Sequence, residues 1–245
     1  MKKPLLLGHR GFSGVYPENT PLAFRMVAEK TKADGIETDV HICKSGELVI
    51  CHDELVDRTS NGHGFIKDLT YDELRALDFG AWKNPDFAGE KICTLGWLLD
   101  FCKEAGLVLN LELKNGVEFY KELEQRCIDE IRSRHMEDTV FVSSFNHVSM
   151  QRFKELAPEI ETGLLYEPPL QDMAHYLDHC NADNVHPCWH VFEYQPELME
   201  LFHSRNMKVN VWTVNDEAAA RFMLDLGVDG LIGNFPDLLC RVAGR

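Results

Sequence analysis

Three acidic side chains stand in two short segments that have the pattern of β-strands. Glu37 and Asp39 are separated by a single residue within 35–42 (GIETDVHI), and Glu112 lies within 107–113 (LVLNLEL). Because side chains alternate between the faces of a strand, the first two carboxylates point the same way. Carboxylates gathered away from water repel one another and are costly to bury unless a cation compensates them. All-oxygen ligands suit a hard ion, so the trio predicts a Mg2+ or Ca2+ site.

A salt-bridged lining without metal is the alternative for these carboxylates, because Lys114 follows Glu112 by two residues and can neutralise it. Two histidines nearby in the predicted fold favour a metal site over this salt-bridged lining. His9 ends the apolar run 5–9 (LLLGH), and His52 ends the extension 48–53 (LVICHD) together with an aspartate. Two histidines on opposite sides of a phosphate can take and give a proton.

Arg10 directly follows the first histidine. Its planar guanidinium can bind two phosphate oxygens at once. A single histidine at a strand end is more often an ordinary hydrogen-bonded residue. Its combination here with carboxylates, an arginine and a lysine favours chemistry on a phosphate ester.

The elements that must position these residues alternate between short apolar runs and amphipathic segments. Strands are predicted at 5–9, 35–42, 107–113, 139–145, 160–166, 183–187, 207–213 and 228–232. Helices are predicted at 20–33, 95–105, 116–134, 147–157, 170–180, 195–205, 216–226 and 236–243. This alternation in 245 residues predicts an α/β fold, a (β/α)8 TIM barrel with its active site at the C-terminal ends of the strands.

Local signals mark the ends of the helices. Small polar residues stand where N-caps are needed, and glycines where a left-handed residue would end a helix. The predicted N-caps are Thr20 (ahead of Pro21), Thr94 and Asn215, and the predicted terminal glycines are Gly35, Gly106 and Gly227.

Residues 53–93 interrupt this alternation, because they are long, polar and rich in turn signals such as 61–64 (NGHG). A loop of this length without structure is uncommon in a compact domain. We therefore expect a small insertion between strand 2 and helix 2, with a short helix at 70–77 (TYDELRAL), inside a single domain that spans 1–245.

The composition limits the possible partners. The chain has 25 Lys+Arg against 40 Asp+Glu, a net charge of −15, and 44% hydrophobic residues. It can bury a full core, and the negative charge argues against nucleic acid as a partner. No apolar run approaches the ~18 residues of a membrane span, so no integral membrane association is expected. The short apolar run after the first lysines does not resemble an export signal, which predicts a cytoplasmic protein. Nothing in the sequence indicates an oligomeric state.

The chain has eight cysteines and no C-x-x-C pair. In a protein without an export signal we expect reduced thiols, several of them in the core. The absence of paired ligand spacing argues against zinc.

In order along the chain, several motifs resemble the signature of the glycerophosphodiester phosphodiesterases. The resemblance spans nearly the whole sequence, and the polar stretch 57–78 is similar to the family's own insertion. The motifs are His9-Arg10-Gly11, Pro17-Glu18-Asn19-Thr20, Glu37-Thr38-Asp39-Val40, His52-Asp53, Leu111-Glu112-Leu113-Lys114, Ser144-Phe145, Trp212-Thr213-Val214-Asn215 and Gly227-Val228-Asp229-Gly230.

The resemblance implies a metal-dependent hydrolysis of small glycerophosphodiesters to sn-glycerol 3-phosphate and an alcohol. In the family mechanism the glycerol 2-hydroxyl attacks phosphorus, and water then opens the cyclic phosphate. The implied roles are metal ligands for Glu37, Asp39 and Glu112, acid and base for His9 and His52, phosphate binding for Arg10 and Lys114, apolar walls for Phe145 and Trp212, and support of the first loop for Glu18 and Asn19.

The sequence departs from the family pattern at Cys43, Ser45, Cys93 and 233–236 (GNFP), where the family usually ends with a Thr-Asp-Tyr-Pro type of sequence. No metal ligand or proton carrier is lost. His186, at the end of the weakest predicted strand, is either structural or a further site residue.

Two other functions stay open on the sequence alone. One is a lysophospholipase D-type hydrolysis of lysophospholipids, which needs an apolar groove at the barrel mouth. The other is a non-catalytic barrel that binds a phosphate ligand. Neither the alcohol of the substrate nor the choice between Mg2+ and Ca2+ can be derived from these residues.

Overall fold

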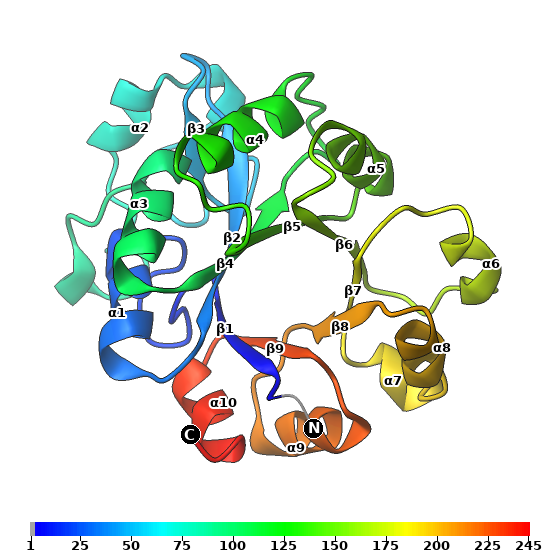
Figure 1. Ribbon diagram of the computed structural model, residues 1–245. Coiled ribbons are helices and arrows are strands. Elements are labelled where there is room, and N and C mark those ends of the chain that lie inside the picture. Colours follow the sequence, from blue (N-terminus) through cyan, green and yellow to red (C-terminus); the bar gives the residue numbers. More distant parts are fainter. Residues whose placement is uncertain (1–2) are drawn as a thin grey trace.

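The computed structural model describes residues 3–245, and its strands form a closed barrel surrounded by helices (Figure 1). The strand order is β1-β9-β8-β7-β6-β5-β4-β2-β3, and β1 also pairs with β2, which closes the ring. All pairings within the ring are parallel, while β3 runs antiparallel to β2 outside it. The predicted (β/α)8 barrel is confirmed.

Apart from β3, the strands agree closely with the segments predicted from alternation. They are β1 (Leu5–His9), β2 (Gly35–Ile42), β3 (Leu48–Ile50), β4 (Val108–Leu113), β5 (Val140–Ser144), β6 (Glu161–Tyr166), β7 (Asn184–Pro187), β8 (Lys208–Val211) and β9 (Gly230–Gly233).

The helices cover the outside of the ring. They are α1 (Pro21–Lys30), α2 (Tyr71–Ala76), α3 (Leu95–Ala105), α4 (Leu123–Ser133), α5 (His147–Leu156), α6 (Met173–Leu177), α7 (Val191–Tyr194), α8 (Leu198–Ser204), α9 (Glu217–Leu226) and α10 (Pro236–Val242). Two short 3-10 turns, Ile66–Asp68 and Pro85–Phe87, belong to the insertion.

The main hydrophobic core lies between the strands and the helices. Leu6, Ile36, Leu109 and Leu111 are fully buried on the strands and belong to one cluster with Phe24 of α1. Because these side chains point outward from the barrel, the alternate residues must point into it. The polar residues of β2 and β4 are thereby directed to the barrel interior, as the alternation predicted.

The insertion has a core of its own. Val49 of β3 packs with Val56, Ile66, Leu74 and Phe79 in a separate buried cluster. The helix predicted at 70–77 is α2, and Thr70 forms a capping box with Glu73. The expectation of a structured insertion is therefore correct, although the sequence pattern did not predict β3 as a strand.

Several helix boundaries differ from the predictions. The helix expected at 116–134 begins only at Leu123, because residues 114–122 form a loop above β4. Asp216, not Asn215, caps α9 by accepting a hydrogen bond from the Ala219 amide. Gly106 and Gly227 are left-handed caps as predicted.

The prediction for Gly35 was wrong, because this glycine is the first residue of β2. A Cβ atom there would lie 2.0 Å from the carbonyl oxygen of Val108 on the neighbouring strand. The glycine is needed for close strand packing instead of a helix cap.

Within residues 3–245, no helix is both long enough and apolar enough to cross a membrane. The eight cysteines are free, and most of them are buried, as expected for small core residues.

Thr20 provides a test of how the first loop is joined to α1. Its hydroxyl accepts a hydrogen bond from the Ala23 amide and donates one to the Pro17 carbonyl oxygen at 2.7 Å. Thr20→Ala should lower the free energy of unfolding by about 1 kcal/mol in urea denaturation, because both bonds are lost. Thr20→Ser keeps the hydroxyl and should recover most of this loss. Equal destabilisation by both variants would assign the effect to the buried methyl group.

Candidate active site

The C-terminal ends of β1, β2 and β4 bring the predicted residues to one side of the barrel. Parallel pairing sets His9 beside Glu37 and Asp39 beside Glu112. A cavity of about 240 Å3 opens there. Its lining consists of His9, Arg10, Glu37, His52, Asn110, Glu112, Phe145, Leu165, Glu167, Trp212 and Ile232.

The three carboxylates are close together and almost completely buried. Glu37, Asp39 and Glu112 each have an oxygen within 4.8 Å of the others, and their exposed fractions are 5%, 1% and 7%. Burial and then the charge of Asp39 raise the pKa of Glu37 well above its usual value. Burial likewise raises the pKa of Glu112 to about 7, despite the opposing effect of Lys114. The surroundings of these two carboxyl groups therefore disfavour their negative charge.

Two cations compensate part of this charge. The Lys114 amine is 3.0 Å from Glu112 Oε1 and 3.7 Å from Asp39 Oδ1. Arg10 Nε is 3.7 Å from Asp39 Oδ2. Burial alone would raise the pKa of Asp39, but His52, Lys114 and Arg10 together lower it. The salt-bridged lining considered from the sequence is thus present in this structure.

This ion pairing does not satisfy every carboxylate oxygen by a hydrogen bond. Asp39 Oδ1 is buried, lies 3.7 Å from the Lys114 amine and has no hydrogen-bond partner among the described residues. A buried carboxylate oxygen without a hydrogen bond is costly, and a coordinated cation would satisfy it. Because all three side chains offer hard oxygen donors, the set fits a divalent ion such as Mg2+ or Ca2+.

The first loop approaches the trio through two residues with left-handed backbone. Arg10 has φ 55° and Asn19 has φ 56°, a region that non-glycine residues enter rarely and often at functional sites. The Asn19 amide donates a hydrogen bond to Asp39 Oδ2 at 2.9 Å, and its carbonyl oxygen accepts one from Thr38. Asn19 therefore fixes the orientation of the Asp39 carboxylate.

His9 is held by a residue from the other end of the chain. Its Nδ1 donates to Asn234 Oδ1 at 2.6 Å, which leaves Nε2 directed towards Glu37 Oε2 at 3.8 Å. Burial, followed by the charge of Arg10, lowers the pKa of His9 to about 4. Asn234 lies in the segment 233–236, where the sequence departs from the family pattern. One of the departing residues therefore contacts His9, a predicted proton carrier.

His52 is oriented by a charged network from the insertion. Its Nδ1 donates to Asp53 Oδ1 at 2.6 Å. Arg58 binds Asp53 Oδ2 through Nε at 2.7 Å and both oxygens of Glu18 at 2.8 and 2.9 Å. Glu18 in turn accepts a hydrogen bond from Arg10 at 2.8 Å. Arg58 thus ties the insertion, the first loop and the histidine together.

The backbone beneath His52 is supported as well. His41 Nε2 contacts the His52 carbonyl oxygen at 3.3 Å, and its Nδ1 contacts the Tyr120 hydroxyl at 3.2 Å. Burial lowers the pKa of His41 to about 4. His41 is therefore a neutral structural bridge between β2, the extension and the loop above β4.

Two aromatic side chains form one wall of the cavity. Phe145 and Trp212 meet edge to face with ring centroids 5.6 Å apart, and Phe145 is 47% exposed. Trp212 is anchored by its indole N–H, which donates to the His186 carbonyl oxygen at 2.7 Å. His186 itself is fully buried, hydrogen-bonded to Asn210 and absent from the cavity lining, which supports its structural interpretation.

No role was predicted from the sequence for Asn234, Asp53, Arg58 or His41. Asp53 and Arg58 stand in segments that the family resemblance includes, so the resemblance could have indicated that they belong to the site. The contact between His9 and Asn234 joins residues 225 positions apart. No local pattern in the sequence indicates that contact.

The sequence profile of the Glycerophosphoryl diester phosphodiesterase family matches residues 9–238. A glycerophosphodiester phosphodiesterase of Caldanaerobacter subterraneus is 40% identical over 243 residues, covering 99% of each chain. One of Bacillus altitudinis is 35% identical over 238 residues, covering 97% of each. The chain therefore belongs to the glycerophosphoryl diester phosphodiesterase family, which confirms the resemblance seen in the motifs.

Two solved structures of phosphodiesterases have a similar fold. The structure of an Oleispira antarctica phosphodiesterase in complex with the product sn-glycerol-3-phosphate matches with a TM-score of 0.91 and 28% identity, covering 99% of this chain and 97% of that one. A glycerophosphodiester phosphodiesterase of Agrobacterium tumefaciens matches with a TM-score of 0.82 and 26% identity, covering 97% and 99%. The barrel is thus the fold of these phosphodiesterases.

The carboxylate trio leads to a test that does not require a substrate. After EDTA treatment, Mg2+ or Ca2+ at about 100 times its Kd should stabilise the folded protein by about 2.7 kcal/mol, because the ion binds only the folded state. The measurement is the thermal midpoint by circular dichroism. Asp39→Asn should remove the shift, whereas Glu104→Gln, on the exposed face of α3, should keep it. A shift that persists in Asp39→Asn would place the ion elsewhere.

Proposed function

We propose that this protein hydrolyses glycerophosphodiesters to sn-glycerol 3-phosphate and an alcohol. Family membership and the names of its relatives support the reaction. So does the Oleispira antarctica phosphodiesterase, whose structure holds sn-glycerol-3-phosphate as the product. The observation that carries the proposal is a cavity lined by two histidines, Arg10, Glu37 and Glu112. Asp39 completes the buried carboxylate trio beside it, and Lys114 pairs with Glu112.

Glu37, Asp39 and Glu112 are proposed to hold a divalent ion, Mg2+ or Ca2+. Such an ion supplies positive charge against the phosphate oxygens and lowers the pKa of a neighbouring hydroxyl group. The buried Oδ1 atom of Asp39, which has no hydrogen bond among the described residues, supports this assignment. The remaining groups of the site then act on the substrate itself.

Arg10 and Lys114 are proposed to bind the phosphate. Both side chains are mostly buried, and both reach the same carboxylate from different strand ends. A phosphate placed between them would be held by charge-assisted hydrogen bonds, which are shorter and stronger than neutral ones. Glu18 and Asn19 support the loop that carries Arg10.

His9 and His52 are proposed to carry the protons. Each donates its Nδ1 proton to a neighbouring oxygen, so in the neutral ring Nε2 is the free acceptor. One histidine can accept the proton of the attacking hydroxyl, and the other can protonate the leaving oxygen. Both line the same cavity, which agrees with such a division of roles.

Phe145 and Trp212 are proposed to contact the carbon skeleton of glycerol. Their edge-to-face pair presents an apolar wall to the cavity that holds both histidines. Packing against this wall would orient the glycerol arm while its phosphate meets Arg10 and Lys114.

Substitution of the histidines tests the proposed reaction. His9→Ala and His52→Ala should each lower kcat for release of glycerol 3-phosphate by about 10²–10⁴-fold, the usual contribution of general acid–base catalysis. His63→Ala is the matched control, because His63 is an exposed histidine of the insertion. Circular dichroism should show an intact fold in all three variants. Full activity in both His9→Ala and His52→Ala would refute the assignment.

A lysophospholipid is a second candidate substrate, and one feature of the structure favours it. A groove of about 470 Å3 adjoins the cavity and shares Phe145, Leu165 and Glu167 with it. Tyr166 and Leu170 add to its largely apolar lining. An acyl chain on the glycerol arm could lie in this groove, which the sequence alone did not reveal.

Parallel assays distinguish the two substrate classes. Glycerophosphocholine should be hydrolysed with a kcat/KM at least about tenfold above that of lysophosphatidylcholine presented in micelles, since the net charge of −15 gives no attraction to a lipid surface. Leu170→Ala, at the far side of the groove, serves as the control. If lysophosphatidylcholine is preferred and Leu170→Ala reduces only that activity, the second candidate is correct.

A further inference from the structure

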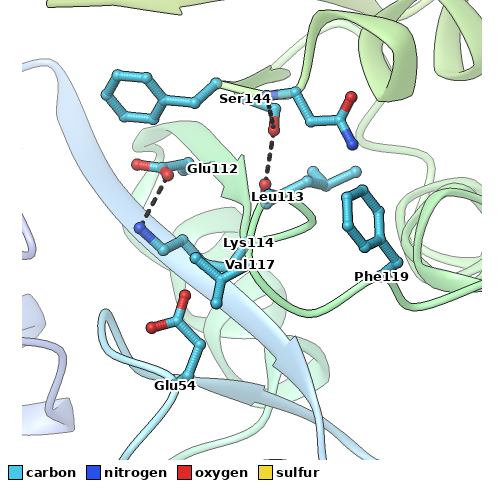
Figure 2. Close-up of a pocket in the computed structure, with 10 residues that line it drawn as sticks. Glu54, Glu112, Leu113, Lys114, Val117, Phe119 and Ser144 are labelled. Atoms are coloured by element: carbon cyan, nitrogen blue, oxygen red, sulfur yellow. Dashed lines mark hydrogen bonds and ion pairs between the residues drawn. The ribbon is translucent and has the colours of Figure 1, made fainter.

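A second pocket lies beside the carboxylate trio, and we call it the side pocket. It has a volume of about 520 Å3 and opens above the C-terminal ends of β4 and β5 (Figure 2). Glu112 and Lys114 line it together with Phe145, and two of these residues also line the histidine cavity. The remaining lining consists of Glu54, Leu113, Gly116, Val117, Phe119, Ser144 and Asn146.

The position of the side pocket corresponds to one arm of a phosphodiester. Such a substrate carries two alcohols on one phosphorus atom, and so it needs two subsites that meet at the phosphate. The histidine cavity and the side pocket meet at Glu112 and Phe145. With the glycerol arm against Phe145 and Trp212, the side pocket offers space for the second alcohol next to Glu112 and Lys114. This step depends on the proposed function.

The lining of the side pocket favours a particular alcohol. The Glu54 carboxylate is half-buried and has no hydrogen-bond or ion-pair partner within residues 3–245. Val117 and Phe119 are large apolar side chains with exposed fractions of 70% and 75%. In Figure 2 the Lys114 amine is directed at Glu112, while Glu54 approaches from the insertion.

The uncharged polar side chains of the pocket, Ser144 and Asn146, already have partners. Ser144 Oγ donates to the Leu113 carbonyl oxygen, and the Asn146 amide donates to the carbonyl oxygen of Asn115. The Asn146 side-chain oxygen accepts from the Ser149 amide. Few groups therefore remain to bind the hydroxyls of a polyol. A carboxylate beside apolar and aromatic surface instead suits a quaternary ammonium, which carries positive charge and donates no N–H hydrogen bond.

The loop that carries Val117 and Phe119 is fixed at its base. Asn115 Oδ1 accepts a hydrogen bond from the Tyr120 amide, and its side-chain amide donates to the buried carboxylate of Glu124. The pocket wall is thus anchored before a ligand arrives, which lowers the entropic cost of binding.

We propose that the side pocket is the subsite of the leaving alcohol and that Glu54, Val117 and Phe119 select alcohols with a quaternary ammonium group. The apolar groove on the other side of Phe145 also has an acid, Glu167. It shares neither Glu112 nor Lys114, so it does not reach the phosphate from the leaving-group side.

The test compares glycerophosphocholine with glycerophosphoglycerol, whose alcohol is neutral. The wild type should have the higher kcat/KM for the choline ester. Glu54→Gln should lower that value about tenfold, because a partly desolvated contact with the cation is lost. Its kcat/KM for the glycerol ester should stay within about twofold of the wild-type value. Phe119→Ala should act in the same direction. Glu104→Gln, which removes the same charge far from the mouth, should retain the wild-type ratio of the two values.

Product inhibition gives a second readout. Choline chloride should inhibit hydrolysis of the glycerol ester by the wild type, and its inhibition constant should rise about tenfold in Glu54→Gln, with sodium chloride as the salt control. The proposal would be overturned if Glu54→Gln left both the ratio of the two kcat/KM values and the inhibition constant of choline unchanged. It would also be overturned if Glu167→Gln, and not Glu54→Gln, removed the preference for the choline ester and the inhibition by choline. If the wild type releases glycerol 3-phosphate from both esters without preference, only this subsite is wrong. If it releases none from either, the proposed function itself fails.

Discussion

The active end of this barrel is arranged around three carboxylates held close together and away from water. Parallel pairing of β2 with β4 sets Asp39 beside Glu112, and the alternation within β2 adds Glu37 on the same face. Lys114 and Arg10 relieve their repulsion in part, and one oxygen of Asp39 has an ion pair but no hydrogen bond among the described residues. A cation bound at a site with this charge balance would in turn attract an anionic phosphate.

The groups that surround the trio orient one another. Arg58 binds Glu18 and Asp53 together, and these two carboxylates hold Arg10 and His52. The insertion is therefore part of the site, since it supplies Arg58, which fixes Arg10 and His52 through these two carboxylates. Mutual ion pairs of this kind restrict side-chain rotation, which favours a preorganised site over one that forms on binding.

The fold could be predicted well because its signals are local. Strands with one apolar and one polar face show a period of two in the sequence, and Gly106 and Gly227 end their helices as expected. The errors occurred where a distant partner decides the local structure. Gly35 is required by the carbonyl of Val108 on another strand, and the start of α4 is delayed because the loop before it is bound through Asn115.

The same distinction applies to the site. The sequence by itself determined which residues carry charge or protons and, through the alternation of β2 and β4, on which face they lie. Only the tertiary structure decided that Asn234 holds His9, that Arg58 reaches across from the insertion, and that Glu54 stands beside exposed Phe119 with no partner in the described part of the chain. The physical reason is that residue type and periodicity are local properties, whereas a hydrogen-bond partner or an unpaired charge depends on how distant segments pack.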